Sequence, residues 1–349
     1  MNSQVADREP YVQCVGGLWS PETGILDSHE YMTHLQADAE SNQATIITNC
    51  EVNSIIETND VISMSGSTAG DSDKRYKVIT NQGEIYCDCI INAAGLHATQ
   101  LAAKLIPLNP TIKSSYLSHI PIVYYAKGNY FKLDSSTSVA TVPATGSGSP
   151  FTHLVYPVPS SHAGLGIHAT LDLSGHVRFG PDVEWILGGR GQNYDSNDEY
   201  AYTTNDPAPS DYTVDTNRSI QFKEAISKYY PNILYETYGT LVPDYSGIRP
   251  KLIGPYTYST GTTTIGQNKA KLSRNLDDFV IEGSEVHGVK GVINLYGIES
   301  PGLTASLASF LLFAVICILL CMLIYYFISY ILYIIYCMYR HLLLCVFVV

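Results

Sequence analysis

Several short motifs that mark common catalytic sites are absent from this 349-residue sequence. It contains no G-x-G-x-x-G, no P-loop, no H-E-x-x-H and no G-x-S-x-G. Gly164-Leu165-Gly166 lacks the third glycine of a dinucleotide fingerprint, and Gly146-Ser147-Gly148 lies in a low-complexity stretch. These residues therefore hold no glycine-rich phosphate loop, no zincin helix and no serine-hydrolase nucleophile turn.

Positive charge and organised cysteines are also scarce. Lys and Arg number 20 against 32 Asp and Glu, which gives a net charge of −12. Such an acidic chain does not favour a nucleic-acid partner. The eight cysteines are split between a polar part and an apolar tail, and no spacing resembles a zinc or disulfide framework. We therefore expect no metal site and a reducing compartment.

The C-terminal part of the chain contains almost no charged side chains. Residues 300–339 carry no charged side chain, and from residue 309 the run is dense in Leu, Ile, Phe, Tyr and Cys. This exceeds the roughly 20 residues that cross a bilayer. Taken literally, residues 309–339 predict an apolar, helical transmembrane tail and a membrane contact.

Two stretches combine a strand, a turn of small residues and a helix start. Val292–Tyr296 is an apolar strand followed by Gly297, Ser300, Pro301 and Gly302, with Pro301 near the first turn of a helix. Ile90-Ile91 precedes Asn92-Ala93-Ala94-Gly95 and a helix over residues 97–105. Small residues would let both backbones approach one extended ligand. The alternative is an ordinary strand-to-helix connection, and the pattern alone does not decide between them.

Other local patterns predict the remaining elements. Helices are expected over residues 27–38, with Ser28 as the N-cap, and over residues 219–230. A hairpin of strands 76–80 and 84–91 should turn at Asn81-Gln82-Gly83. Further short strands are expected at residues 44–48, 50–57, 120–125, 129–133, 152–158, 164–171, 176–179 and 279–282.

This order predicts a mixed α/β (α+β) fold. Residues 41–110 and 276–308 would form an incomplete Rossmann-like lobe, and residues 111–275 a β-rich substrate lobe inserted between them. That inserted lobe would include a flexible Ser/Thr/Gly-rich insertion at residues 134–150. Residues 1–40 would lie on the substrate side, and residues 309–349 form the apolar tail.

Five polar or aromatic residues could carry chemistry. Arg249, in a turn bracketed by Gly and Pro, is a natural fork for a carboxylate, although a surface ion pair is about as plausible. His168 could act as a general base, but a lone His on a strand is more often a satisfied core residue. Lys127, Tyr130 and Tyr156 could line a substrate pocket or simply pack in a sheet.

Seven blocks in this order resemble the D-amino-acid-oxidase-like superfamily of FAD-dependent oxidoreductases, and most closely its L-2-hydroxyglutarate dehydrogenase/oxidase group. The blocks are Ser20-Pro21-Glu22-Thr23-Gly24-Ile25, Asn92-Ala93-Ala94-Gly95-Leu96, Lys127-Gly128-Asn129-Tyr130-Phe131, Tyr156-Pro157-Val158-Pro159, Leu165-Gly166-Ile167-His168-Ala169-Thr170, Gly247-Ile248-Arg249-Pro250-Lys251 and Gly297-Ile298-Glu299-Ser300-Pro301-Gly302-Leu303-Thr304.

The resemblance implies oxidation of a 2-hydroxy acid to a 2-oxo acid, with FAD passing the electrons to a quinone or oxygen. Arg249 would hold the substrate carboxylate, His168 would be the base, and Lys127, Tyr130 and Tyr156 would line the substrate side. The residues implied for FAD binding are Val52 near the adenine, then Asn92, Ala93, Ala94, Gly95 and Leu96, and at the flavin Gly297, Ile298, Glu299, Ser300, Pro301, Gly302, Leu303 and Thr304.

The sequence departs from the family pattern at both ends. The family begins with a strand, G-x-G-x-x-G and helix, which are missing here, and it continues after residue 308 with a soluble amphipathic helix. Either the apolar tail is a real membrane anchor, or an error in gene prediction has altered both ends; we favour the second. Two other functions stay open: an inactive membrane-tethered binding module, and an amine or amino-acid oxidase of the same superfamily. Eukaryotic relatives of this type suggest a mitochondrial location.

Overall fold

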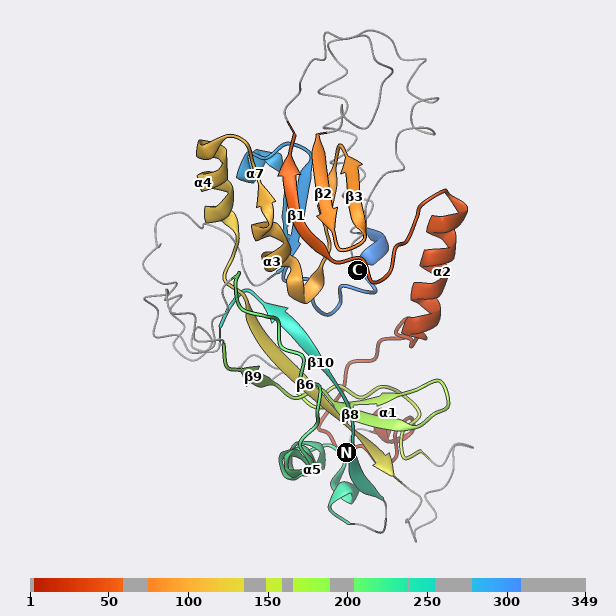
Figure 1. Cartoon of the computed structure of the whole chain (residues 1–349). Helices are drawn as coiled ribbons and strands as arrows, with labels where there is room; N and C mark the ends of the chain where they lie inside the picture. Colours follow the sequence, from red (N-terminus) through yellow and green to blue (C-terminus); the bar gives the residue numbers. More distant parts are fainter. Residues whose placement is uncertain are drawn as a thin grey trace, which may run out of the picture.

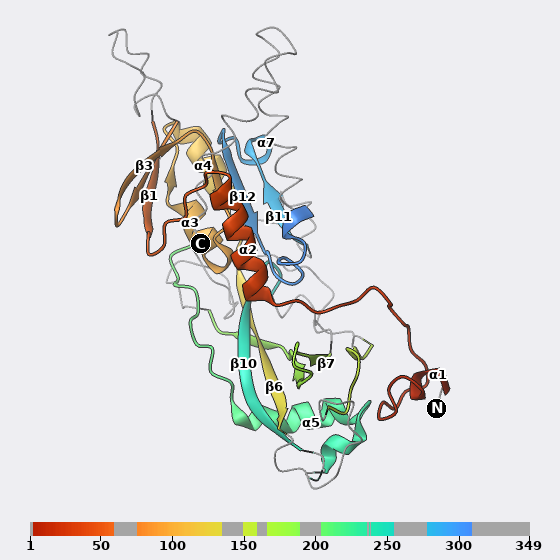
Figure 2. The same ribbon diagram turned by 90° about the vertical axis from the view of Figure 1, so that its right-hand side faces the viewer.

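A computed structural model describes residues 3–58, 75–134, 149–158, 166–188, 204–235, 237, 239–254 and 278–308. These residues form a mixed α/β fold with two lobes, as the sequence predicts (Figure 1). The upper lobe in Figure 1 holds two sheets and helices α3, α4 and α7, and the lower lobe holds one sheet with α5. The long strands β6 and β10 run between the two lobes, which a view from the side shows clearly (Figure 2).

The first sheet of the upper lobe has the strand order β3-β2-β1-β5. The predicted hairpin is confirmed, since β2 and β3 pair with Thr80 opposite Gly83. The second half of the expected strand 84–91 is separate, because the chain turns after Cys87 and joins another sheet as β4. The strands are β1 (Val52–Glu57), β2 (Tyr76–Thr80), β3 (Gly83–Cys87) and β5 (Leu105–Ile106).

The second sheet of the upper lobe joins segments that are about 200 residues apart along the chain, in the order β11-β12-β4. Its strands are β4 (Ile90–Asn92), β11 (Val280–Glu282) and β12 (Val292–Tyr296). All five residues of β12 are buried, as expected for the apolar run. β12 pairs with β4 in parallel, with Asn294 opposite Asn92.

The lower sheet has the order β10-β6-β8-β7, and β9 also pairs with β6. One continuous strand, β6, replaces the two strands expected at residues 120–125 and 129–133. Arg249, expected in a turn, lies inside β10, where it is paired with Ala126. The strands are β6 (Tyr124–Asp134), β7 (His168–Leu171), β8 (Val177–Gly180), β9 (Glu184–Ile186) and β10 (Thr240–Lys251).

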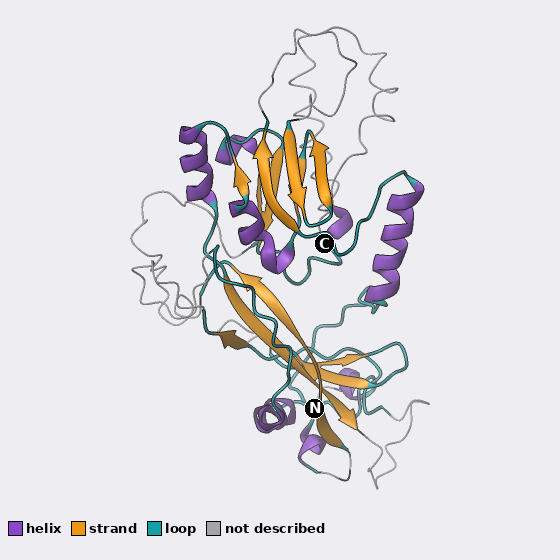
Figure 3. Cartoon of the chain, in the orientation of Figure 1, coloured by secondary structure: helices purple, strands orange, loops and turns teal. Residues whose placement is uncertain are grey.

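Helices α3 and α4 share the upper core with both sheets of that lobe, and α5 packs against β8 and β10 of the lower sheet (Figure 3). In α2 the N-cap is Asp27 rather than Ser28, because the Asp27 carboxylate accepts hydrogen bonds from His29 N and Glu30 N. No residue of α2 is fully buried, but Tyr31, Leu35 and Ala39 on its predicted apolar face are half-buried, and the Tyr31 hydroxyl lies 3.2 Å from Ser306 Oγ. The helices are α1 (Ser3–Ala6), α2 (Ser28–Ser41), η2 (Gly95–His97), α3 (Ala98–Ala103), α4 (Pro110–His119), η3 (Thr216–Arg218), α5 (Ser219–Ser227), η4 (Pro231–Leu234) and α7 (Ser284–His287).

Each lobe has its own apolar core. The upper core includes Tyr76, Leu105 and Tyr116, and the lower core includes Phe131 and Phe222, whose ring centroids lie 4.6 Å apart. Burying one such side chain stabilises the fold by about 1.5–3 kcal/mol. Phe131 of β6 and Leu241 of β10 belong to the lower core, and polar residues of the same two strands form the site described below.

Some predictions are wrong or lie outside the described residues. Residues 44–48 form no strand, and residues 152–158 contribute only an isolated bridge between Val155 and Ala169. Residues 135–148 of the expected insertion and the apolar stretch 309–349 are not described. Within the part of the chain that is described, no helix has the length and apolar character needed to span a membrane.

Candidate active site

Two turns of small residues lie at the same edge of the upper lobe. β4 and β12 are parallel and in register at Asn92 and Asn294, so the segments that follow both strands leave the sheet at one edge. We call residues 93–96 the first turn and residues 297–304 the second turn. Ligands of open α/β sheets bind at the carboxyl ends of parallel strands. The structure thus brings together the two segments that the sequence assigns to one cofactor.

The Asn92 side chain fixes the first turn. Its amide nitrogen donates to Ala98 O at 2.7 Å and to Asn294 Oδ1 at 3.0 Å, and its Oδ1 accepts from Ala94 N at 3.3 Å. Asn294 in turn donates to the Tyr116 hydroxyl at 3.3 Å. Burial raises the pKa of Tyr116 to about 12, so this hydroxyl stays neutral. The turn is therefore held from behind by a largely buried polar network.

Glycine is needed at defined points of both turns. Gly95 has φ +55° and Gly297 has φ +66°, a region that other residues enter at a cost. A Cβ placed on Gly95 would meet no atom within 4 Å, whereas one on Gly297 would lie 2.9 Å from Leu252 Cγ. The first turn thus has an open side and the second is packed from behind. Residues with these properties fit the close approach of an extended cofactor.

The second turn differs from the sequence prediction in one respect. Residues 301–305 form a turn in which Ala305 N donates to Pro301 O at 2.9 Å, and helical residues begin only at 306. The Ser300–Pro301 peptide bond is cis, and Gly302 N donates to Glu299 O. The predicted helix start at Pro301 is therefore wrong by about one turn.

Val52 and Leu96 are anchored to their surroundings through backbone atoms. Val52 is buried in the upper core, and its carbonyl accepts a hydrogen bond from Lys104 Nζ at 2.6 Å. The Leu96 carbonyl accepts one from the Tyr125 hydroxyl at 2.6 Å. Tyr125 belongs to β6, so the first turn is tied directly to the long strand pair.

A second group of side chains lies on one face of the β6–β10 pair. We call Tyr130, Tyr156, His168, Tyr245 and Arg249 the arginine–tyrosine group. The Arg249 side chain hydrogen-bonds to Tyr130, whose pKa is raised by burial against the lowering effect of that guanidinium. Tyr130 stacks on Tyr245 at 4.5 Å between ring centroids, and Tyr156 lies 4.2 Å from the His168 ring. The structure therefore gathers four of the five residues that the sequence proposes.

Strand register explains this gathering. Arg249 is opposite Ala126, and side chains alternate along a strand, so Arg249 shares a face with Tyr130. His168 is opposite Gly180, where a Cβ would lie 2.6 Å from Tyr130 Cδ1. Only a residue without a side chain at position 180 leaves room for the Tyr130 ring against β8.

The arginine–tyrosine group meets the second turn through Glu299. Lys251 Nζ lies 2.6 Å from Glu299 Oε1, and Arg249 Nη1 lies 4.0 Å from Glu299 Oε2. Lys251 follows Arg249 by two residues on β10 and so shares its face. We did not single out Lys251 from the sequence; the same spacing would have indicated it once residues 240–251 were recognised as a strand.

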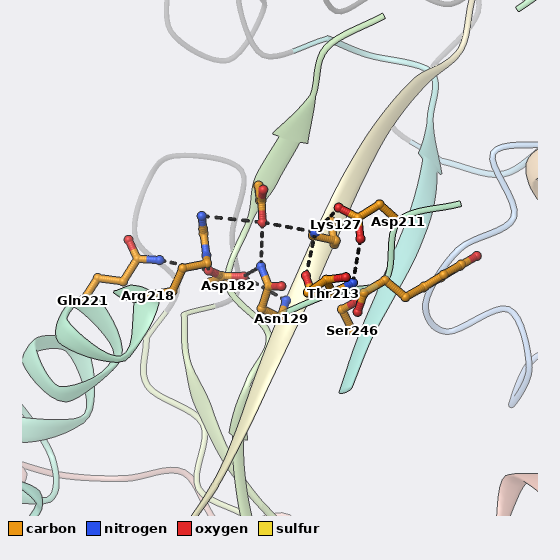
Figure 4. Close-up of polar contacts among 10 residues, drawn as sticks. Lys127, Asn129, Asp182, Asp211, Thr213, Arg218, Gln221 and Ser246 are labelled. Atoms are coloured by element: carbon orange, nitrogen blue, oxygen red, sulfur yellow. Dashed lines mark hydrogen bonds and ion pairs between the residues drawn. The ribbon is translucent and has the colours of Figure 1, made fainter. Parts of the chain in front are cut away.

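Lys127 has different surroundings (Figure 4). It alternates with Ala126 on β6, so it lies on the face opposite Tyr130. Its Nζ donates to Thr213 O at 2.9 Å and lies 3.9 Å from Glu184 and 3.8 Å from Asp211. The structure therefore does not bring Lys127 to Arg249. Its neighbours form a back cluster of Asn129, Asp182, Glu184, Asp211 and Arg218.

Comparison with known proteins shows which family this chain belongs to. Residues 1–314 match the DAO family, described as FAD dependent oxidoreductase. The chain belongs to this family. The predicted superfamily, and with it FAD as the family's cofactor, is thus confirmed.

Individual members of the family differ in how similar their sequences are to this chain. An Arabidopsis thaliana protein named L-2-hydroxyglutarate dehydrogenase, mitochondrial, is 37% identical in an alignment 319 residues long, which covers 86% of this chain and 56% of that protein. The L-2-hydroxyglutarate dehydrogenase of Salmonella houtenae is 26% identical over 187 residues, 53% of this chain and 36% of its own length. The chain thus spans little more than half the length of the first of these relatives.

A solved structure shares the fold of this family member. The L-alpha-glycerophosphate oxidase of Mycoplasma pneumoniae, solved with FAD bound, aligns with a TM-score of 0.52 and 19% identity. The alignment covers 88% of this chain and 60% of that one. The mixed α/β architecture is therefore that of FAD-dependent oxidases.

Proposed function

We propose that this chain serves in the FAD-dependent oxidation of a 2-hydroxy acid, L-2-hydroxyglutarate, to 2-oxoglutarate. The observation that carries the proposal is the arginine–tyrosine group beside the second turn, where a guanidinium, a histidine and three tyrosines meet next to the segment that we propose to hold the flavin. The named relatives that are similar to this chain support this choice of substrate.

Arg249 would bind the substrate carboxylate. Its guanidinium offers a planar pair of donors that suits a carboxylate. It is oriented by its hydrogen bond to Tyr130 and is only loosely engaged by Glu299, at 4.0 Å. The side chain is 27% exposed, so a small ligand can reach it.

His168 would accept the proton of the substrate's 2-hydroxyl. The residue is 6% exposed, and its ring is partly covered by the half-exposed Tyr156. A general base in such a sheltered position exchanges its proton with the substrate rather than with bulk water. Tyr156 would form the wall that opens to admit the acid.

The two turns would hold FAD, which when bound supplies the acceptor for the two electrons that leave the substrate. In the first turn the cofactor contacts would come from residues 92–96, and in the second from residues 297–304. The open side of Gly95 is where the backbone can come closest to the cofactor. Val52 is proposed to lie near the adenine.

The assignments of the two lobes, of the electron acceptor and of the cellular location are also proposals. Residues 41–110 and 276–308 would form the FAD lobe, with residues 111–275 as the substrate lobe and residues 1–40 beside it. A quinone or oxygen would accept the electrons. A mitochondrial location is proposed because the Arabidopsis thaliana and Pongo abelii relatives carry that word in their names.

Flavin reduction by substrate provides the test. The purified full chain should show flavin absorbance that bleaches without oxygen on addition of L-2-hydroxyglutarate, and not with the D enantiomer. Arg249→Met should raise the concentration of acid needed for half-bleaching at least tenfold. Arg249→Lys keeps the positive charge but loses the paired donors of the guanidinium, so its half-bleaching concentration should be intermediate. A protein that binds flavin but bleaches only with amino acids would overturn the substrate in favour of an amino-acid oxidase.

A further inference from the structure

Glu299 lies between two cations of β10 but engages them unequally. Its Oε1 is 2.6 Å from Lys251 Nζ, whereas its Oε2 is 4.0 Å from Arg249 Nη1. The first distance is a strong charge-assisted hydrogen bond and the second is only a long-range ion pair. Lys251 is 17% and Glu299 19% exposed, so water weakens their pairing only in part.

Without Lys251, the geometry would favour another pair. Glu299 comes from the second turn and reaches the face of β10 that carries both cations. A free carboxylate so close to a guanidinium forms a two-point ion pair, which is the preferred arrangement of these groups. Such a pair would occupy the same donors that a substrate carboxylate needs.

We propose that Lys251 is a positioning residue that holds Glu299 away from Arg249 and so keeps the guanidinium available for the carboxylate of the substrate. This inference rests on the proposed function, because it assumes that Arg249 binds the acid. Lys251 itself does not touch the substrate in this scheme.

The charges of the three groups agree with this role. Arg249 and Lys251 carry two positive charges and Glu299 one negative charge, which leaves one positive charge in a half-buried setting. One of the two carboxylates of the acid balances this positive charge. If Glu299 paired with Arg249 instead, an internal ligand fixed in place would compete with the substrate at a high effective concentration.

Binding of an unreactive acid to the FAD-loaded full chain tests the inference. Titration of glutarate by calorimetry should give a dissociation constant about tenfold higher for Lys251→Met than for the unchanged chain. Michaelis constants for L-2-hydroxyglutarate should rise in parallel while kcat changes less than twofold. Lys251→Arg, which can still hold Glu299, should keep the affinity within about twofold, and urea unfolding reports whether each variant is folded.

The decisive variant is Lys251→Met combined with Glu299→Gln. A neutral amide cannot compete for Arg249, so the double variant should recover most of the lost affinity. Unchanged affinity in Lys251→Met, or no recovery in the double variant, would overturn the inference while the proposed function stands. If the unchanged chain binds neither glutarate nor L-2-hydroxyglutarate, the proposed function fails and this inference falls with it.

Discussion

Asn92 and Asn294 lie opposite each other on two parallel strands, and Asn92 Nδ2 donates a hydrogen bond to Asn294 Oδ1 at 3.0 Å. The two residues are 2% and 1% exposed. Segments separated by about 200 residues along the chain are thus joined by a buried amide contact, at the last residue of β4 and two residues before the end of β12. A buried polar pair of this kind is stable only while each partner is present.

Removing the Asn92 side chain should therefore destabilise the fold and loosen the first turn. Asn92→Ala leaves Asn294 Oδ1, Ala98 O and Ala94 N without their partner. We expect the free energy of unfolding in urea to fall by about 2–3 kcal/mol, the cost of unpaired buried polar groups. Asn53→Ala, at an exposed position of β1, is the control and should change it by less than about 0.5 kcal/mol. Equal effects of the two variants would contradict the structural role.

Gly95→Ala should affect flavin binding more than stability. Adding a Cβ at φ +55° costs about 1 kcal/mol, and the new methyl would point into the open side of the first turn. Gly288→Ala is the matched control, since φ is +80° and the nearest atom to its Cβ is at 3.9 Å, but it lies at the opposite end of the parallel pair. Flavin content after purification should fall in Gly95→Ala alone. If both variants lose flavin equally, general destabilisation is the cause.

Lys127→Met should lower the stability of the fold. The substitution leaves the Thr213 carbonyl and the Glu184 carboxylate without the ammonium between them, so the free energy of unfolding should fall by about 1–2 kcal/mol. Lys132→Met, at an exposed position of the same strand, should be close to neutral. A rise in the Michaelis constant at unchanged stability would instead place Lys127 among the substrate contacts.

Acid should weaken the turn between β7 and β8. Partial burial raises the pKa of Asp172, but hydrogen bonds from the His176 and Ser174 backbone and from Arg178 outweigh it and lower the pKa to about 2. A lowered folded-state pKa gives stability that is present above the unfolded value of roughly 3.9 and is lost as the pH falls through the folded value.

Asp172→Asn tests this pH dependence. It should lower the free energy of unfolding by on the order of 1 kcal/mol above about pH 5, after allowance for solvent screening, and the difference should shrink toward pH 2. Asp38→Asn on the exposed helix α2 is the control. A difference that stays constant between pH 6 and pH 3 would show that the charge of Asp172 is not the cause.

Elements with a strong local signal were predictable from sequence. The apolar run Val292–Tyr296 is β12, and the hairpin at residues 81–82 has its turn where the glycine places it. The helix after the first turn ends at Ala103 instead of residue 105, because Leu105 pairs with Ile55 in a parallel strand. That pairing depends on residues 50 positions away and has no local signal.

The site was predictable as a set of residues but not as a geometry. Arg249 was expected in a turn because Gly and Pro flank it, yet β10 continues through Pro250, which pairs with Tyr125. Helix α4, which supplies Tyr116 behind Asn294, was missed because its residues have no clear apolar face. The Asp27 cap of α2 was missed in favour of Ser28, although both residue types cap helices.

The alternation along β6 limits how this protein can change its length. Tyr130 belongs to the arginine–tyrosine group and Lys127 to the back cluster only because they lie an odd number of positions, three, apart on one strand. Inserting or deleting a single residue between them would put both side chains on the same face and move a buried ammonium toward Arg249. Length changes here are tolerated only in steps of two, so relatives that keep both sites should preserve this spacing even where β6 differs in sequence.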